Sequence, residues 1–416
     1  MPETKKRNCR TPFASASLIV LAIIVSGCTD QSGSQPVDPK QMAWEDIVAA
    51  ADGGSVNWWM FGGSEPINNW VRDWVKPQLA EQYNITLNQI PVGGPLEFVN
   101  QVASEKEAGN TNDGLVDTMW INGENFRFMK ENDLLYGPWA LDVPTSDYID
   151  WEEESIAFDF GYPVNGYELA YGSAQFVMGY DSARVPEPPE SISDLIDWIK
   201  TNPGRFTYPA ATDFTGSAFV RQMCYHAIGG PDDFLGDFDP ELFEERFPAC
   251  WDLLNEIESS LWNNGAYPST INELQQLFAT GEIDYEMSYN AGGLQTRVDS
   301  GFYPDTADTF VFDEGTLANT SYIAIAFNTP DQAASLVAAN FLCGPEAQLS
   351  ATETINWQTP LDLDRLPTEW RERFEAVPRG PKVLPPELLA SHRLPELQGP
   401  WIEAITAGWI ENVLEQ

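Results

Sequence analysis

Histidine and cysteine are scarce in this chain of 416 residues, which contains two histidines and five cysteines. With only His226 and His392 available, a histidine-based metal centre or a Ser–His or Cys–His nucleophilic site is hard to build. We therefore expect no metal, no cofactor and no catalytic activity. Cys224, Cys250 and Cys343 follow no metal-binding spacing. In an oxidising compartment Cys224 and Cys250 could form a disulfide, although the sequence does not give their separation in space.

Basic residues are also few. There are 22 lysines and arginines against 63 aspartates and glutamates, which gives a formal net charge of -41. Such a surface repels nucleic acids and anionic membranes, so neither is expected as a partner. The acidic residues are spread along the chain and are not gathered in a tail. This distribution favours a heavily hydrated surface over an acidic cation trap, and both interpretations stay open.

The N-terminal apolar run, residues 18–25, is too short to span a membrane, which takes about 20 apolar residues. It follows a basic start and fits the apolar region of a signal peptide, which predicts residues 1–27 as a leader. The Val-Ser-Gly-Cys sequence ending at Cys28 resembles a bacterial lipobox, in which the cysteine is lipidated. The alternative is an ordinary cleaved signal. Residues 28–54 are interpreted as a lipid anchor and tether.

After the tether, strand and helix patterns alternate. Residues 55–61, 85–90 and 115–121 are β-prone, and helical patterns separate them, beginning near Pro66 and Leu96. This order indicates an open, largely parallel α/β sheet. Ligands bind at the carboxyl ends of the strands in such sheets. The loops 58–64 and 121–126 are therefore candidate binding loops, although neither has the spacing of a phosphate loop.

A second alternating unit begins near residue 173. A strand pattern at 322–327 can return the chain to the first unit, and an amphipathic tail carries Trp401, Ile405, Trp409 and Val413. The predicted fold class is α/β with two lobes. The predicted boundaries are 55–172 plus 322–416 for the first lobe and 173–321 for the second.

Four segments, residues 57–70, 120–126, 174–186 and 202–219, resemble the YnjB-type substrate-binding proteins of ABC transporters. The resemblance runs from about Val56 to the C-terminus. It implies a type II-like periplasmic-binding-protein fold, with a ligand cleft between two lobes that are joined by crossing strands. It also implies capture of a small solute by hinge closure and delivery to an ABC permease in the inner membrane. It also implies a location in the periplasm or cell envelope. We expect the protein to act as a monomer.

Hinge closure requires ligand contacts from both lobes, so we choose polar and aromatic residues at strand ends. The first-lobe candidates are Trp59, Gly63, Ser64, Asn122, Glu124 and Asn125. The second-lobe candidates are Asp213, Thr215, Gly216, Ser217, Tyr289 and Asn290. Two weaker candidates at the crossing or rim are Gln175 and Trp357. Aromatic rings combined with acidic groups suit a flat or cationic solute. The resemblance to related binders implies a thiamine-like or polyamine-like ligand.

Structural roles compete with these ligand roles. Trp58 and Trp59 are adjacent on a strand, so one should face the core and the other the opposite side. Glu124 and Asn125 could cap the helix that begins near Phe126. Each of these side chains therefore has a local role that would not involve a solute.

The same ambiguity applies to the second lobe. Residues 215–217 could offer backbone N–H groups to an anion or form an ordinary helix N-terminus. Asp213 could balance a ligand cation or act as a cap. Tyr289 could belong to the core or to the site.

Other functions are possible on the same sequence. One is a ligand-binding receptor or sensor lipoprotein that signals without transport. Another is an exported carboxylate-dependent hydrolase, for which a carboxyl pair with perturbed pKa values would be required. Ferric-iron binding is disfavoured because the Tyr289-Asn290 step has no neighbouring tyrosine.

Overall fold

The computed structural model describes residues 38–415, and Pro39–Gln416 form one compact unit. The predicted signal peptide and the lipidation site Cys28 lie outside the described residues. Within residues 38–415, no helix has the length and apolar character needed to cross a bilayer. The last part of the predicted tether is folded, because it forms helix α1 (Trp44–Ala50) and buries Ile47 in a core.

The first sheet is mixed. Strands β1 (Ser55–Phe61), β2 (Thr86–Val92) and β3 (Thr118–Ile121) are parallel to one another, as the alternating pattern predicts. Strand β10 (Thr316–Ile325) runs antiparallel to β3 on one side and to β6 (Glu168–Gln175) on the other. Its start also pairs with the short strand β11 (Arg393–Leu394). The crossing strands therefore make this sheet antiparallel at one side, which sequence alternation alone did not predict.

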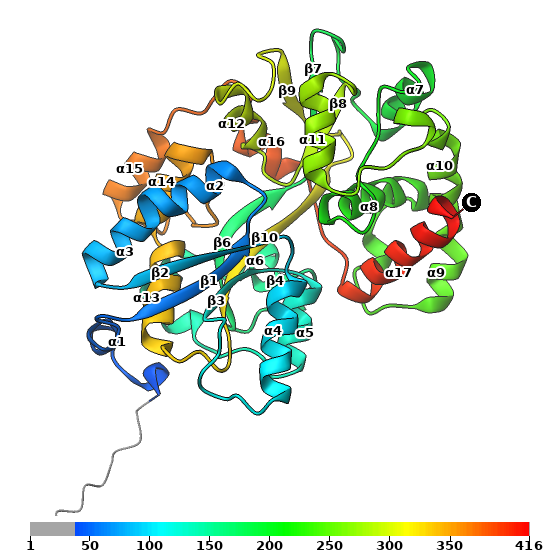
Figure 1. The fold of residues 1–416 in the computed structure, drawn as a ribbon. Coiled ribbons are helices and arrows are strands. Elements are labelled where there is room, and N and C mark those ends of the chain that lie inside the picture. The colour runs from blue at the N-terminus through cyan, green and yellow to red at the C-terminus, as the bar shows by residue number, and fades with distance from the viewer. Residues whose placement is uncertain (1–37, 416) are drawn as a thin grey trace, which may run out of the picture. The chain divides into compact units, whose positions relative to one another are not determined.

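Helices cover both faces of this sheet (Figure 1). The helical pattern after Pro66 forms α2 (Glu65–Trp70), a π-helical turn (Val71–Val75) and α3 (Lys76–Tyr83), with a buried apolar stripe along it. We call the residues buried on this face, with α13 (Gln332–Cys343) and α14 (Pro345–Ile355), the first core. The opposite face packs against α4 (Leu96–Glu107) and α5 (Glu124–Glu131).

The second sheet has the order β8-β7-β9 and is antiparallel. Its strands are β7 (Val177–Asp181), β8 (Tyr285–Ser288) and β9 (Ala307–Phe310). Phe176 alone separates β6 from β7, and a short segment joins β9 to β10, so two crossings connect the sheets (Figure 1). The buried residues around this sheet, which we call the second core, include side chains of α7 (Ile192–Thr201), α8 (Phe214–Ile228), α10 (Pro248–Glu258) and α11 (Ile271–Thr280).

The C-terminal helix belongs to the second core. The predicted stripe of Trp401, Ile405, Trp409 and Val413 is buried there, along α17 (Gly399–Trp409) and the π-helical turn Ile410–Leu414. Residues 395–398 carry the chain from β11 into α17 and form a third connection. This packing differs from the predicted assignment of all of 322–416 to the first lobe. Periodicity identified the buried face of the helix but could not tell which core it faces.

Cysteine pairing is settled by the fold. Cys224 on α8 and Cys250 on α10 form a disulfide, which was one of the two outcomes left open by the sequence. Cys343 on α13 is buried as a free thiol.

Shorter elements complete the chain. The helices are α6 (Glu154–Ala157), α9 (Pro240–Arg246), α12 (Gly293–Asp299), α15 (Thr368–Glu375) and α16 (Pro386–Ser391), and a two-stranded hairpin is formed by β4 (Phe158–Asp159) and β5 (Tyr162–Pro163). Short 3-10 turns lie at Pro39–Gln41, Ala140–Asp142, Pro144–Tyr148, Asp232–Phe234 and Trp262–Asn264.

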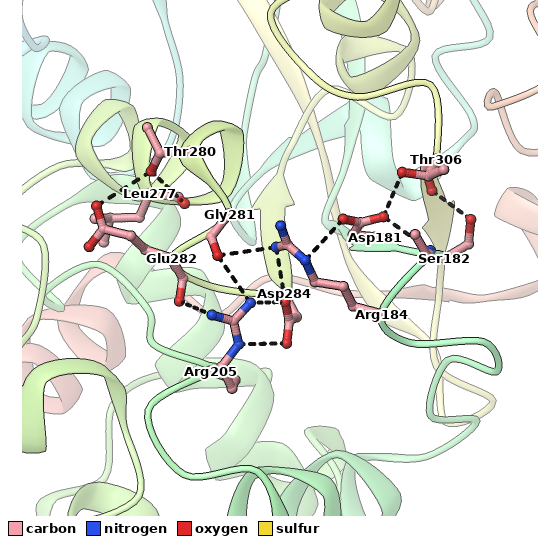
Figure 2. A network of polar contacts seen from close by, with 11 residues as sticks. Asp181, Ser182, Arg184, Arg205, Leu277, Thr280, Gly281, Glu282, Asp284 and Thr306 are labelled. Atoms are coloured by element: carbon pink, nitrogen blue, oxygen red, sulfur yellow. Dashed lines mark hydrogen bonds and ion pairs between the residues drawn. The ribbon is translucent and has the colours of Figure 1, made fainter.

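An arginine–carboxylate network lies at the end of β7 that is farther from the crossing (Figure 2). Arg205 binds Asp284 through two hydrogen bonds, and Arg184 reaches the same carboxylate at 3.2 Å. Arg184 also pairs with Asp181, which accepts a hydrogen bond from the Thr306 hydroxyl. We call this group the distal network. It ties the loops at the ends of all three strands together.

Candidate functional site

A buried polar cluster lies where the two sheets and the third connection meet. Arg221 on α8 donates to Glu396 in the 395–398 segment, with a closest N–O distance of 3.0 Å. It also donates to the hydroxyls of Tyr289 (3.0 Å) and Ser217 (2.7 Å). Asn319 on crossing strand β10 donates to Glu396 at 3.3 Å. We call these five residues the central cluster.

The ion pair at its centre is almost fully buried, with both side chains only 2% exposed. Burial acts to lower the pKa of Arg221, but Glu396 and the surrounding groups outweigh it and raise the pKa. The guanidinium therefore stays charged. Tyr289 has a pKa well above its usual range, because of burial first and the nearby Glu396 carboxylate second.

Two further carboxyl groups approach from the first-lobe elements. Asp159, at the end of β4, accepts the Gly123 N–H at 2.6 Å through one oxygen, and its other oxygen has no hydrogen-bond partner among the described residues. Burial raises its pKa well above the usual range, and Glu124 and Glu396 raise it further by repulsion. Burial also raises the pKa of Glu124, with Arg221 opposing and Glu396 adding to that shift. Asp159 thus interacts with the charges of Glu124 and Glu396, and Arg221 with those of Glu124 and Glu396.

A wall of aromatic rings lies beside the cluster. Phe214, the first residue of α8, is 43% exposed and lies 5.0 Å from the Tyr289 ring, between centroids. Phe160, in the turn between β4 and β5, lies 6.3 Å from Phe214 and is buried in the second core. Phe176, at the crossing, contacts Tyr289 at 5.9 Å. An exposed ring beside buried carboxyl groups can stack on a flat or cationic group.

The N-terminus of α8 is closed by its own cap. The Asp213 carboxylate accepts the N–H groups of Thr215 (2.9 Å), Gly216 (3.0 Å) and Ile271 (3.0 Å), and its carbonyl accepts that of Ser217. The capping interpretation of Asp213 and 215–217 therefore describes the local structure. Gly216 is required there because a Cβ would lie 2.3 Å from two backbone oxygens. Because the N–H groups of the first turn are occupied, this helix end offers little to an anion.

At α5, the cap is Gly123, which has a φ of 64°. Glu124 and Asn125 are the first two residues of the helix, so neither occupies the N-cap position. The Asn125 side chain is buried and donates to Glu124 at 3.2 Å. Asn122, half-buried, precedes the glycine whose N–H binds Asp159. These residues therefore lie in the first lobe, beside the carboxyl groups of Glu124 and Asp159.

Other predicted residues lie apart. Trp58 is buried in the first core, whereas Trp59 is half-buried on the opposite face and donates to the Leu115 carbonyl at 3.2 Å. Gly63 and Ser64 precede α2, and the Ser64 side chain forms no cap. Within residues 38–415, no hydrogen bond or ion pair joins Trp59, Gly63 or Ser64 to the central cluster.

Three more predicted residues have local partners. Asn290 accepts the Gly292 N–H at 3.0 Å and shapes the turn after β8. The Gln175 side chain donates to the Thr316 hydroxyl, and the Trp357 indole donates to the Tyr171 carbonyl. Gln175 and Trp357 line a separate cavity of about 270 Å³. The ligand roles of all these residues stay predictions.

Sequence reasoning missed Arg221, Glu396, Asp159 and Asn319. Arg221 lies four residues after the predicted Ser217, which places the two side chains on one helix face, and this spacing could have identified it. Glu396 lies in an irregular segment far along the chain, and no pattern points to it. In the described part of the chain, no group of three or more histidine, cysteine or acidic residues is arranged to hold a metal ion.

Comparison with known proteins places this architecture in a family. Residues 74–365 match the bacterial extracellular solute-binding proteins. Protein YnjB of Escherichia coli (strain K12) is 31% identical over 372 residues, which cover 89% of this chain and 93% of that protein.

Two solved structures share the fold. The spermidine/putrescine ABC transporter substrate-binding protein PotD from Streptococcus pneumoniae has a TM-score of 0.62 at 15% identity, covering 87% of this chain and 99% of PotD. A periplasmic thiamin binding protein has a TM-score of 0.56 at 14% identity, covering 86% and 96%. The family match and the identity to YnjB both span most of the chain, so they establish the family of this chain. This chain belongs to the bacterial extracellular solute-binding proteins, the solute-binding components of ABC-type transport, and its predicted YnjB-type family and periplasmic-binding-protein fold are confirmed.

Proposed function

We propose that this solute-binding protein captures a small, positively charged solute between its lobes and delivers it to an ABC permease in the inner membrane. The positive charge of the solute is inferred from the number of carboxyl groups, because they outnumber the one arginine, Arg221. Asp159 and Glu396 are buried and Glu124 is partly buried. Glu124 and Asp159 belong to first-lobe elements and Glu396 to the connecting segment, and one Asp159 oxygen lacks a hydrogen-bond partner among residues 38–415. Buried, unbalanced carboxylates are costly unless a cation joins them.

The arrangement of these groups supports capture by hinge closure. Glu124 and Asp159 belong to first-lobe elements, whereas Arg221 and Tyr289 belong to second-lobe elements. A cation that contacts both sets binds more strongly when the lobes are closed, which is what couples binding to closure. Phe214 supplies an exposed ring for stacking. A polyamine-like or thiamine-like solute fits this chemistry.

Likeness to a polyamine-type and a thiamin-binding structure at 14–15% identity concerns the fold alone. The case for a cation therefore rests on the carboxyl groups of this chain. No catalytic step is proposed for the solute, which is released unchanged to the permease.

The test is a thermal-unfolding and calorimetric screen of residues 29–416, which contain the compact unit. Spermidine, putrescine and thiamine are compared with glutamate and glucose. A cation present at about 100 times its Kd should add roughly 2.7 kcal/mol to the free energy of unfolding. Stabilisation by glutamate or glucose alone would contradict the proposal.

The exported hydrolase is kept as a second candidate because Glu124 and Asp159 are neighbouring carboxyl groups with raised pKa values. Mass spectrometry of the bound solute after prolonged incubation separates the two functions. Recovery of intact solute fits a binding protein, and a cleaved product fits the hydrolase.

We also propose that a lipid on Cys28 anchors the protein to the membrane, which rests on the lipobox-like sequence alone. Detergent phase partition of the expressed full chain tests it. The native chain should enter the detergent phase, and Cys28→Ser should shift it to the aqueous phase.

A further inference from the structure

The cavity of about 270 Å³ that Gln175 and Trp357 line lies against crossing strand β6. Its walls come from β6, from the end of α14 and the loop after it, from α15, and from the segment 378–393 that contains α16 and β11. Predicted site residues Gln175 and Trp357 line it, but none of the central cluster does.

Strand alternation places this cavity on the other face of the crossing strands from the central cluster. Gln175 and Ser173 are two residues apart on β6, and the Gln175 side chain donates to the hydroxyl of Thr316 at 3.1 Å. Asn319, an odd number of residues from Thr316 on β10, points instead to Glu396. Successive side chains of a strand alternate between faces. The cavity is therefore distinct from the cation site proposed above.

The charge of the lining is opposite to that of the whole chain. No aspartate or glutamate lines this cavity in the described structure, whereas Arg379 and Arg393 both do. The chain as a whole has 63 acidic and 22 basic residues. A concave surface with two arginines and no carboxylate is therefore the reverse of what composition favours.

Arg393 is held but not neutralised. Its guanidinium donates to the Ser173 hydroxyl at 3.3 Å and forms no ion pair within residues 38–415. Burial lowers the pKa of Arg393, and Glu153 opposes this shift from outside the cavity lining. A guanidinium has five N–H donors in a planar fork, so donors are left for a planar anion.

The rest of the lining consists of apolar, amide and hydroxyl side chains. Trp357, Phe374, Val377 and Leu384 form apolar walls, and Gln175 supplies an amide. We propose that this cavity binds a small monocarboxylate with an apolar body, its carboxylate paired with Arg393 and its body packed against Trp357. The occupant would supply the anion that Arg393 lacks.

The segment 378–393 is also fixed to the second lobe. The Lys382 N–H binds Gln295 on α12 at 2.9 Å, and its ammonium pairs with Asp308 on β9 at 3.4 Å. A molecule in the cavity contacts this segment and β6 together, so it sits beside the hinge.

The experiment is calorimetric titration of residues 29–416 with benzoate, phenylacetate and hexanoate, each paired with its neutral amide. At least one acid should bind, and its amide should bind about tenfold more weakly or worse, because the amide cannot pair with the guanidinium. The proposal is overturned if no acid binds, or if acid and amide bind equally.

Arg393→Gln should abolish acid binding, whereas Arg371→Gln, which removes an exposed arginine outside the lining, should leave it unchanged. Arg393→Lys is the second variant if Arg393→Gln does not fold; it keeps the charge, loses the planar fork and should weaken binding by several fold. Unchanged acid binding in a folded Arg393 variant would place the acid elsewhere and end the proposal. Cation binding in the central cluster is measured separately and does not affect this result.

Discussion

The distal network and the central cluster use the same groups in opposite ways. In the distal network, two arginines meet two aspartates, and the backbone carbonyls of residues 281 and 282 accept further hydrogen bonds from the guanidinium groups (Figure 2). Its arginines are 41% and 35% exposed. The network is balanced in charge and open to water, so it is complete without a ligand.

The central cluster is buried, and the carboxyl groups in and beside it outnumber its one arginine. A single guanidinium serves Glu396 while Glu124 and Asp159 lie nearby with raised pKa values. A protein that needed only a brace would gain nothing from this excess of acid. The balanced network therefore ties the ends of the second-sheet strands together, whereas the excess of carboxyl groups beside Arg221 is the feature on which the proposed cation site rests.

The largest effect is expected from Arg221→Met. This change leaves Glu396 buried with no cation and should lower the free energy of unfolding by about 3–5 kcal/mol. Urea unfolding at neutral pH measures it. Combining it with Glu396→Gln should restore much of the loss, because no unpaired charge is then buried. An effect as small as that of a surface arginine would show that the cluster is hydrated.

The second effect is on binding. Asp159→Asn keeps an acceptor for the Gly123 N–H but removes a buried negative charge. A charge-assisted contact is worth about 1.5–3 kcal/mol, so affinity for the cation found in the screen should fall by roughly tenfold to a hundredfold. Calorimetry measures this, with the exposed Asp305→Asn as the matched control. Equal affinities for both variants would remove Asp159 from the site.

The third effect lies in the distal network. Arg205→Gln leaves Asp284 paired with Arg184 at 3.2 Å, and the site is partly exposed. The free energy of unfolding should therefore fall by about 1 kcal/mol or less. Cation affinity should not change. A loss of affinity comparable to that of Asp159→Asn would mean that the two networks are coupled, and the comparison would fail.

Much of the fold could be predicted from the sequence, because strand and helix periods survive in it. The parallel order of β1, β2 and β3 and the buried stripe of α17 follow from periodicity and apolar spacing. The partner of α17 does not, because an apolar stripe carries no information on which core it joins. The mixed sheet was also missed, because the direction of a strand depends on its pairing with strands that are far away in the sequence.

The site was predicted less completely. Ser217, Tyr289 and Glu124 come to the central cluster from strand and helix ends, where the sequence placed them. Glu396 comes from an irregular segment and Asp159 from a two-residue strand, and neither has a periodic signal. Asp213 was correctly considered as a cap, because Asp before a helical run is a known N-cap pattern.

The smallest effect concerns the pH dependence of stability. It tests whether burial and the neighbouring carboxyl groups destabilise the ionised form of Asp159. Because burial raises its folded-state pKa above the unfolded value of about 3.9, ionising Asp159 destabilises the folded protein, and this cost is absent below the unfolded value and complete above the folded one. Asp159→Asn removes the cost. Without solute, the variant should therefore be more stable than the native chain at neutral pH.

That advantage should shrink as the pH falls and should vanish below about 3.9, where the native carboxyl is protonated in both the folded and the unfolded state. Urea unfolding at several pH values measures it, with Asp305→Asn as the control that should show no such trend. If the advantage of Asp159→Asn were the same at every pH, the gain in stability would come from packing and not from the removal of a charge. The charge of Asp159 would then be a poor reason to expect a cation beside it.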